Sequence, residues 1–289
     1  MTSDLDPRDK LDLDVAVWEY PPGRPSDNLQ SLACSYGGYR EKVGRSVRRL
    51  EVSRDRVMVI LGVGDRFQIN ALEPKASSIA CQAFVVGLGE APLLVEHDGF
   101  QHCIEIELLP GAAHQLFRGA SAELAQGVVD LGQVWGETNL LLEQLSQMAS
   151  WQQGFSLVDQ FLLEKFAQSN QKVRSEIQWA WNQLDYSGGC IPIQQLAKTL
   201  GWSDRHFTNQ FHEQIGITPK TAARRIRFTR SHQLLTGSNL ALSEIAAACG
   251  YSDQSHFTRE FHSFAGCSPT LYRKAHFPDL PGTPGDIIC

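Results

Sequence analysis

The sequence of 289 residues lacks a long apolar run and an amino-terminal targeting segment. Residues 1–14 carry charged side chains throughout, whereas a signal peptide needs an apolar stretch behind a basic start. No apolar run approaches the roughly 18 residues that span a bilayer. We therefore expect a chain that works in the cytoplasm and does not bind a membrane.

The C-x-x-C motif is absent as well, although the chain has seven cysteines. Their scattered spacing and odd number fit neither a zinc site nor a secreted disulfide framework, so reduced thiols are expected. A redox sensor is the alternative, and it would need an exposed cysteine with a low pKa. The positions are Cys34, Cys81, Cys103, Cys190, Cys249, Cys267 and Cys289.

Signatures of catalysis are missing too. No G-x-S-x-G nucleophile elbow occurs, and His97, His102 and His114 do not form the HxH-Glu pattern of a metal-binding cupin. The sequence therefore predicts neither an enzyme nor a bound metal or other cofactor.

The charge is unevenly distributed. The whole chain carries −6, yet ten basic against five acidic residues give residues 191–274 a charge of +5. Such a split indicates a polyanion-binding module joined to an acidic one.

Short β-branched and apolar runs separated by Pro and Gly fill the first part of the chain, as at 57–63 and 78–88. They are typical of strands in a sandwich or barrel, which we expect over residues 1–118. Over Ile104–Leu108 apolar and charged residues alternate, as in a half-buried strand. Five arginines between positions 45 and 56 are expected on a solvated hairpin face, with an anion site as the alternative.

After the β-rich part of the chain, apolar residues recur at helical spacing over residues 138–148 and 155–166. We expect a helical linker over residues 119–170, whose stripes either pack within the monomer or join two copies. A helical domain is expected over 171–276. The final residues, 277–289, are expected to form a flexible tail.

An internal repeat relates residues 193–221 to residues 242–271, and the second copy carries one extra residue. In each copy we expect a short helix, a left-handed glycine (Gly201 or Gly250) and a second helix with inward phenylalanines. The expected caps of the second helices are Ser203 and Ser252. Two helices joined by such a turn form a helix-turn-helix, whose second helix enters the DNA major groove.

The segment Gly250–Lys274 resembles the signature of the AraC/XylS family of transcription regulators, including its final Ser-Pro-x-x-Tyr-Arg. The resemblance extends over residues 173–275, with Ser231 replacing the usual Ala of the connecting helix. It implies a seven-helix domain that presents two recognition helices to successive major grooves. It also implies a cupin-like sensory domain before a helical linker, so the expected fold class is α+β multidomain.

The resemblance also implies which side chains meet DNA. The base-reading positions correspond to Arg205, His206, Thr208, Asn209, Gln254, Ser255, His256 and Arg259. The arginines can pair with guanine and Gln254 with adenine, whereas the histidines have the alternative of holding their helix ends. Phosphate contacts are expected from Arg224, Arg225, Arg227 and Arg230, with a solvated or internally paired face as the alternative.

The predicted function is sequence-specific regulation of transcription, activation more readily than repression. Double-stranded DNA, RNA polymerase, a small effector in the N-terminal domain and a second copy of the chain are the expected partners. No residue identifies the effector, and a protein partner could take its place. Two rival hypotheses are a thiol sensor and an enzyme fused to the DNA-binding module.

Overall fold

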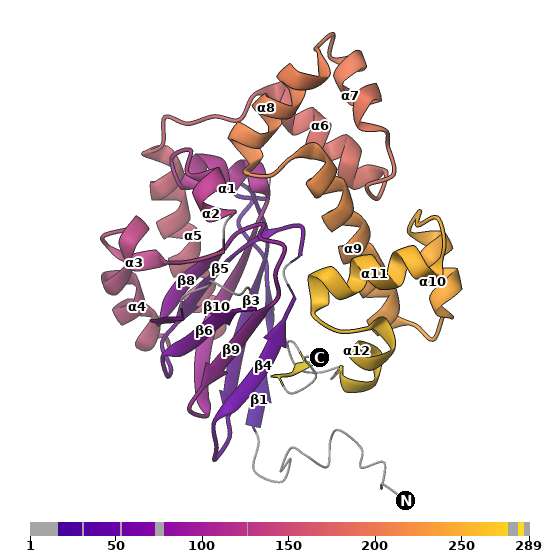
Figure 1. Cartoon of the computed structure of the whole chain (residues 1–289). Helices are drawn as coiled ribbons and strands as arrows, with labels where there is room; N and C mark the ends of the chain where they lie inside the picture. The colour runs from indigo at the N-terminus through magenta and orange to yellow at the C-terminus, as the bar shows by residue number, and fades with distance from the viewer. Residues whose placement is uncertain are drawn as a thin grey trace, which may run out of the picture.

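The computed structural model describes residues 17–30, 32–52, 54–72, 78–125, 127–276 and 283–285. Strands dominate the N-terminal part and helices the C-terminal part (Figure 1). This arrangement confirms the predicted α+β class with a β-sandwich followed by an all-helical domain.

Two antiparallel sheets form the sandwich. The described residues give one sheet of seven strands, ordered β1-β3-β10-β5-β8-β11 with β2 on β3, and one of five strands, ordered β12-β4-β9-β6-β7. The bounds are β1 Val17–Glu19, β2 Pro22–Gly23, β3 Ala33–Lys42, β4 Val47–Glu51, β5 Val57–Gly62, β6 Phe67–Ala71, β7 Ile79–Cys81, β8 Ala83–Val86, β9 Leu93–His97, β10 Phe100–Leu108, β11 Val128–Asp130 and β12 Thr283–Pro284.

The alternation in β10 separates two environments rather than a core from solvent. Ile104 and Ile106 are buried in the cluster under the helices, while Cys103 joins a cluster with Tyr39 and Phe67 between the sheets. The charged side chains of β10 share the face of Cys103, because alternate residues of a strand point to the same side. The half-buried strand that the pattern predicted is therefore covered on both faces.

In the described part of the chain, five helices come after β10, with β11 between the second and the third; α3 to α5 lie beside the larger sheet, and α1 and α2 lie at its upper end (Figure 1). The five helices are α1 Pro110–Leu116, α2 Ser121–Leu124, α3 Leu131–Val134, α4 Thr138–Ser146 and α5 Trp151–Ala167. The ring of Phe155 stacks on Tyr36 with centroids 6.0 Å apart. Gly38 makes room for this helix, since a Cβ there would lie 2.4 Å from the Trp151 ring. The apolar stripe of α5 thus packs within the monomer.

Strand β11 departs from the expected helical linker, because it lies inside 119–170 yet pairs with β8. Its three residues are too few to show a periodicity.

The C-terminal part contains seven helices within residues 171–276, all of which the structure describes, as the resemblance implied. They are α6 Ser175–Tyr186, α7 Ile193–Thr199, α8 Asp204–Ile215, α9 Pro219–Gly237, α10 Leu242–Ala248, α11 Gln254–Ala265 and α12 Pro269–Ala275. The long α9 joins a first unit around α7 and α8 to a second around α10 and α11 (Figure 1). Phe207 of the first unit shares a core with the sandwich helices, whereas Phe257 belongs to a separate core.

The prediction of a flexible tail is wrong for Thr283 and Pro284, which pair with β4 as strand β12. Thr283 is fully buried there. Residues 277–282 and 286–289 lie outside the described part. Within the described residues no helix combines the length and apolarity needed to cross a membrane.

Candidate nucleic-acid interface and the neighbouring cavity

Both repeats form the predicted helix-turn-helix. Gly201 and Gly250 lie in the left-handed region, with φ of +69° and +73°. Behind each glycine the main-chain N–H of Trp202 or Tyr251 donates to a carbonyl of the preceding helix at 3.0 Å. This hydrogen bond closes the helix end and sets the direction of the second helix.

The caps of the second helices differ between the repeats. In α8, the Ser203 hydroxyl accepts from the N–H of His206 at 3.2 Å, as predicted. In α11 the prediction of Ser252 is wrong, because the Asp253 carboxylate accepts from the N–H of His256 at 2.7 Å. The extra residue of the second copy moves the cap one position onward. That hydrogen bond, with further ones from neighbouring groups, lowers the pKa of Asp253.

The phenylalanines of both second helices point inward. Phe207 and Phe211 of α8 are fully buried, and so are Phe257 and Phe261 of α11. The predicted base-reading side chains occupy the remaining faces of these helices. Six of them are exposed and Thr208 and His256 are half-buried; the exposed ones are Arg205, His206, Asn209, Gln254, Ser255 and Arg259.

The two histidines pack against the aromatic residue of their own turn. The His206 ring lies 4.6 Å from that of Trp202, and the His256 ring lies 5.3 Å from that of Tyr251. Nδ1 of His256 is also 3.2 Å from the Ser252 hydroxyl. These contacts favour the alternative in which the histidines hold their helix ends.

The four arginines of α9 have different surroundings. Arg230 is exposed, whereas Arg224 and Arg227 pair with Glu260 at 2.9 and 3.6 Å. The prediction of a phosphate contact is wrong for Arg225, because it is fully buried. Its guanidinium donates to the carbonyls of Arg54 and Gly89 in the sandwich, and burial lowers the pKa of this side chain to about 10.

Each recognition helix touches the N-terminal part at its C-terminal end. Gly216 ends α8 with a φ of +90°, and a Cβ there would lie 2.2 Å from the carbonyl oxygen of Ser121. The Ser121 hydroxyl donates to the carbonyl of Gln214 at 3.1 Å. Gly266 ends α11, and a Cβ placed on this glycine would lie 3.3 Å from Cγ of Pro92. The sandwich and its helices thus contact both helix-turn-helix units.

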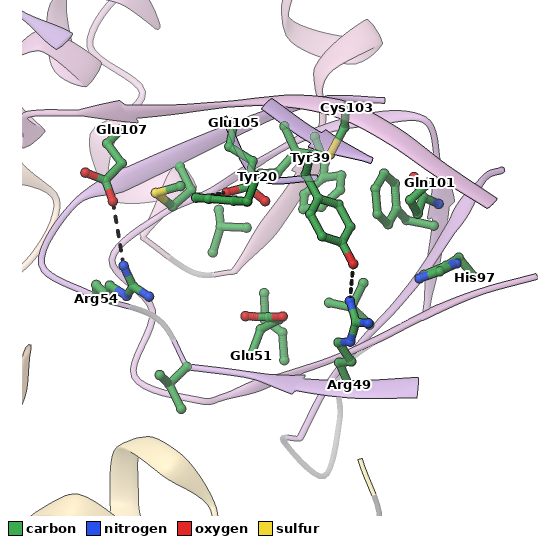
Figure 2. A pocket seen from close by; sticks show the side chains of 18 of the residues that line it. Tyr20, Tyr39, Arg49, Glu51, Arg54, His97, Gln101, Cys103, Glu105 and Glu107 are labelled. Atoms are coloured by element: carbon green, nitrogen blue, oxygen red, sulfur yellow. Dashed lines mark hydrogen bonds and ion pairs between the residues drawn. The ribbon is translucent and has the colours of Figure 1, made fainter. Parts of the chain in front are cut away.

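A cavity of about 740 Å³ opens between the two sheets and reaches the second helix-turn-helix unit. Strands β4 and β10 supply polar side chains from opposite walls (Figure 2). The helical domain closes one end with side chains of α9 and residues at α12, which are His232, Gln233, Thr236, Tyr272 and His276. Sequence reasoning missed this site because no motif marks it.

One end of the cavity holds a closed network of charges. Arg49 donates to the Glu41 carboxylate and to the hydroxyl of Tyr39, and Nε2 of His97 lies 3.2 Å from Glu41. Burial disfavours the Glu41 carboxylate, but its contacts with His97 and Arg49 prevail and lower the pKa to about 2. The expected solvated arginine face is thus wrong for Arg49, which is buried.

Glu51 lies in the cavity without such partners. No described side chain donates a hydrogen bond to its carboxylate. Burial, and then the nearby charge of Glu105, raise the pKa of Glu51 to about 7. Burial raises the pKa of Glu105 as well, although the hydroxyl of Tyr20 donates to it at 2.8 Å.

Three of the described cysteines are buried with raised thiol pKa values. Cys81, Cys103 and Cys249 are buried, and burial raises their pKa values, to about 11 for Cys81. Cys190 is exposed. Because a sensor needs an accessible thiolate, the three buried cysteines do not suit the redox alternative.

Comparison with known proteins addresses the C-terminal domain. Residues 196–275 match the family model described as "Helix-turn-helix domain". The HTH-type transcriptional regulator Rv1931c of Mycobacterium tuberculosis is 35% identical over 31% of this chain and 34% of that protein. The HTH-type transcriptional activator RhaS of Shigella boydii serotype 18 is 30% identical over 36% of this chain and 37% of that protein. The chain thus spans about a third of these relatives.

Longer matches are weaker in sequence. The probable transcriptional regulator LumQ of Photobacterium leiognathi is 24% identical over 77% of this chain and 84% of that protein. Among solved structures, ToxT from Vibrio cholerae O395 aligns at a TM-score of 0.49 with 11% identity, over 82% of this chain and 96% of that one.

Two helix-turn-helix units joined by a long helix make the C-terminal part a DNA-binding domain. It is a domain of the AraC type, which confirms the resemblance of residues 250–274, and the relatives that share it are transcriptional regulators.

Proposed function

We propose that this chain is a transcription regulator in which the sandwich controls how two recognition helices meet DNA. The observation that carries the proposal is that both helices expose polar side chains while their C-terminal ends rest on the N-terminal part. The functional division is then a sensory part up to residue 170 and a DNA-binding part over 171–276.

Base recognition falls to the exposed side chains of α8 and α11. Arg205 and Arg259 each pair with a guanine, and Gln254 pairs with an adenine. Asn209 and Ser255 flank them, and Thr208, His206 and His256 lie at the edge of the same surfaces. Arg230 is the arginine of α9 best exposed for a phosphate, since Arg224 and Arg227 are paired with Glu260.

Control by a small effector is supported by the position of Arg54. Its guanidinium lines the cavity, and its main-chain carbonyl accepts a hydrogen bond from Arg225 of α9 at 3.1 Å. A ligand that shifts Arg54 therefore also shifts the contact that holds the DNA-binding domain. Such coupling requires that the ligand bind two arrangements of the domains with different affinities.

Activation through RNA polymerase is the output that we propose, since RhaS relatives are named activators. A second copy of the chain is the other proposed partner. Leu140 of α4 is 63% exposed and Leu163 of α5 is 37% exposed. These side chains offer an apolar contact outside the stripe that α5 buries against the sheet.

Selection of bound fragments from a random DNA pool tests the proposal. The full chain is used at about 150 mM salt, because affinity for DNA depends steeply on salt. Two short boxes one helical turn apart are expected. Arg205→Ala should blur one box and Arg259→Ala the other, so that each variant controls for the other. Enriched sequences without paired boxes, or boxes that neither variant changes, would overturn the proposal.

A further inference from the structure

The interdomain cavity combines an apolar part with an acidic part. Phe67, Phe84 and Ile60 line it from strands of both sheets, and Tyr20 and Tyr39 add aromatic rings. Its volume of about 740 Å³ lies within the range of small-molecule sites. The cavity can therefore enclose an organic molecule with an apolar body.

The charges that line the cavity do not balance. Arg49 is neutralised by Glu41, as the ion pair between them shows. Arg54 then remains against three carboxylates, and its separation from Glu107 is 3.8 Å. The other two carboxylates belong to Glu51 and Glu105. A bound cation would offset this excess of negative charge.

Two acceptors in the cavity wall have no donor among the described residues. The Glu51 carboxylate accepts no hydrogen bond from them, and Figure 2 shows it pointing from β4 toward Glu105 on β10. Gln101 is fully buried, and its Oε1 has no hydrogen-bond partner in the same part of the chain. Buried polar groups normally find partners, so the unpaired Oε1 of Gln101 calls for a donor, and the half-buried Glu51 carboxylate is open to a ligand that donates.

We propose that the cavity binds an amphipathic organic cation, with a basic nitrogen between Glu51 and Glu105 and an apolar body against Phe67 and Phe84. The proposal names the effector class for the regulator proposed above and rests on that function. The rings of Tyr20 and Tyr39 line the same cavity, and aromatic rings attract positive charge. The raised pKa of Glu51 agrees with it, since a cation restores the charged carboxylate.

An anionic ligand fits the same cavity poorly. Its natural partner, Arg49, is already engaged with Glu41 and Tyr39. Arg54 is paired with Glu107, and the remaining acidic groups, Glu51 and Glu105, offer an anion no positive partner. The choice between cation and anion is therefore open to a direct test with probes of equal shape.

Isothermal titration of the full chain with 4-phenylbutylamine, 4-phenylbutan-1-ol and 4-phenylbutanoate makes that test. The amine is expected to bind at least about tenfold more tightly than the alcohol or the carboxylate, which is a difference of about 1.4 kcal/mol. Glu51→Gln should weaken binding of the amine at least about tenfold and leave that of the alcohol nearly unchanged.

Two further variants keep the result interpretable. If Glu51→Gln disturbs folding, Glu105→Gln replaces it in the test. This second variant should also weaken binding of the amine at least about tenfold. Glu96→Gln is the control, because Glu96 pairs with Arg48 on the outer face of the same sheet. Carboxylate binding as tight as amine binding, no binding by any probe, or amine binding unchanged in both cavity variants would overturn the ligand class. Selection of DNA by the same preparation then shows separately whether the regulator function stands.

Discussion

The side chain of Arg225, in the middle of a DNA-binding domain, is buried and donates from Nε to the main-chain oxygen of Arg54 at 3.1 Å. A second donor of the same guanidinium bonds to the carbonyl of Gly89. Close by, the Asp55 N–H donates to the Thr229 hydroxyl at 3.2 Å. A buried cation that binds carbonyl oxygens thus ties helix α9 to the loops of the sandwich.

Arg225→Met should loosen this tie. The carbonyls of Arg54 and Gly89 lose a charged donor, which costs about 1–3 kcal/mol for the docked arrangement if water does not replace it. We expect faster hydrogen exchange at residues 54–57 and in α9, and a change in DNA affinity without ligand. Arg230→Met is the control for hydrogen exchange alone, because Arg230 is exposed on the same helix but is itself the proposed phosphate contact. Equal exchange in both variants would show that Arg225 does not hold the domains together.

Arg259→Ala should reduce DNA affinity by about 1–3 kcal/mol and relax the preference at one base pair. The side chain is exposed on α11, the helix capped by Asp253. Competition assays with single-base variants of the selected site measure both effects. An unchanged preference at every position would mean that another residue of α11 reads the base.

Arg227→Ala and Arg230→Ala should differ in their salt dependence. Arg227 is engaged with the carbonyl of Gly189 at 3.0 Å and with Glu260, so its loss should lower the melting temperature more than the salt slope. Exposed Arg230, if it meets a phosphate, should reduce the slope of log affinity against log salt by about 1 when replaced. Equal slopes for both variants would place Arg230 away from the DNA backbone.

The helix-turn-helix units were predictable because their signals are local. Left-handed glycines, paired phenylalanines and helix caps act within one turn of chain, so Gly201 and Gly250 could be placed from the sequence alone. The error at Ser252 was local too, because one inserted residue moved the cap to Asp253. The fate of Arg225 depended on a carbonyl 171 positions away and gave no local signal.

The cavity was beyond the reach of sequence patterns for a related reason. Alternation in β10 predicts that Glu105 and Glu107 share a face, but not whether that face meets water or a second sheet. Pairing of β10 with β3 and β5, and of β4 with β9, decides this. Such pairings join distant segments, so only the folded chain brings Glu51 opposite Glu105.

Gly216→Ala should cost more than Gly201→Ala, although both glycines are left-handed. A Cβ on Gly201 meets nothing within 4 Å, so only the backbone penalty of about 1–2 kcal/mol applies. A Cβ on Gly216 collides with the carbonyl oxygen of Ser121 and must push α8 from the N-terminal part. Chemical denaturation compares the stabilities, and DNA selection should show a changed box spacing for Gly216→Ala only. Equal losses would argue against the contact with Ser121.

Glu51→Gln should stabilise the chain at high pH and not at low pH. The pKa of Glu51 rises from 4.5 to about 7 on folding, because of burial and the charge of Glu105, while Arg49 and Arg54 oppose the rise. Below pH 4.5 the carboxyl is protonated in both the folded and the unfolded state, and wild type and variant should be nearly equal. Above pH 7 the wild type carries a buried charge that costs about 1–3 kcal/mol.

Chemical denaturation at about pH 4 and about pH 8 measures this difference, because the lower value lies below the unfolded pKa of 4.5 and the higher one lies above the folded pKa of about 7. Glu96→Gln, which removes a half-exposed carboxylate paired with Arg48, should change the free energy of unfolding by less than about 0.5 kcal/mol at both pH values. If Glu51→Gln raises the free energy of unfolding as much at the low pH as at the high pH, packing and not the buried charge explains the gain in stability. If Glu51→Gln lowers the free energy of unfolding at the high pH, the charged carboxylate has a donor in the free protein. The case for a cationic ligand would then weaken.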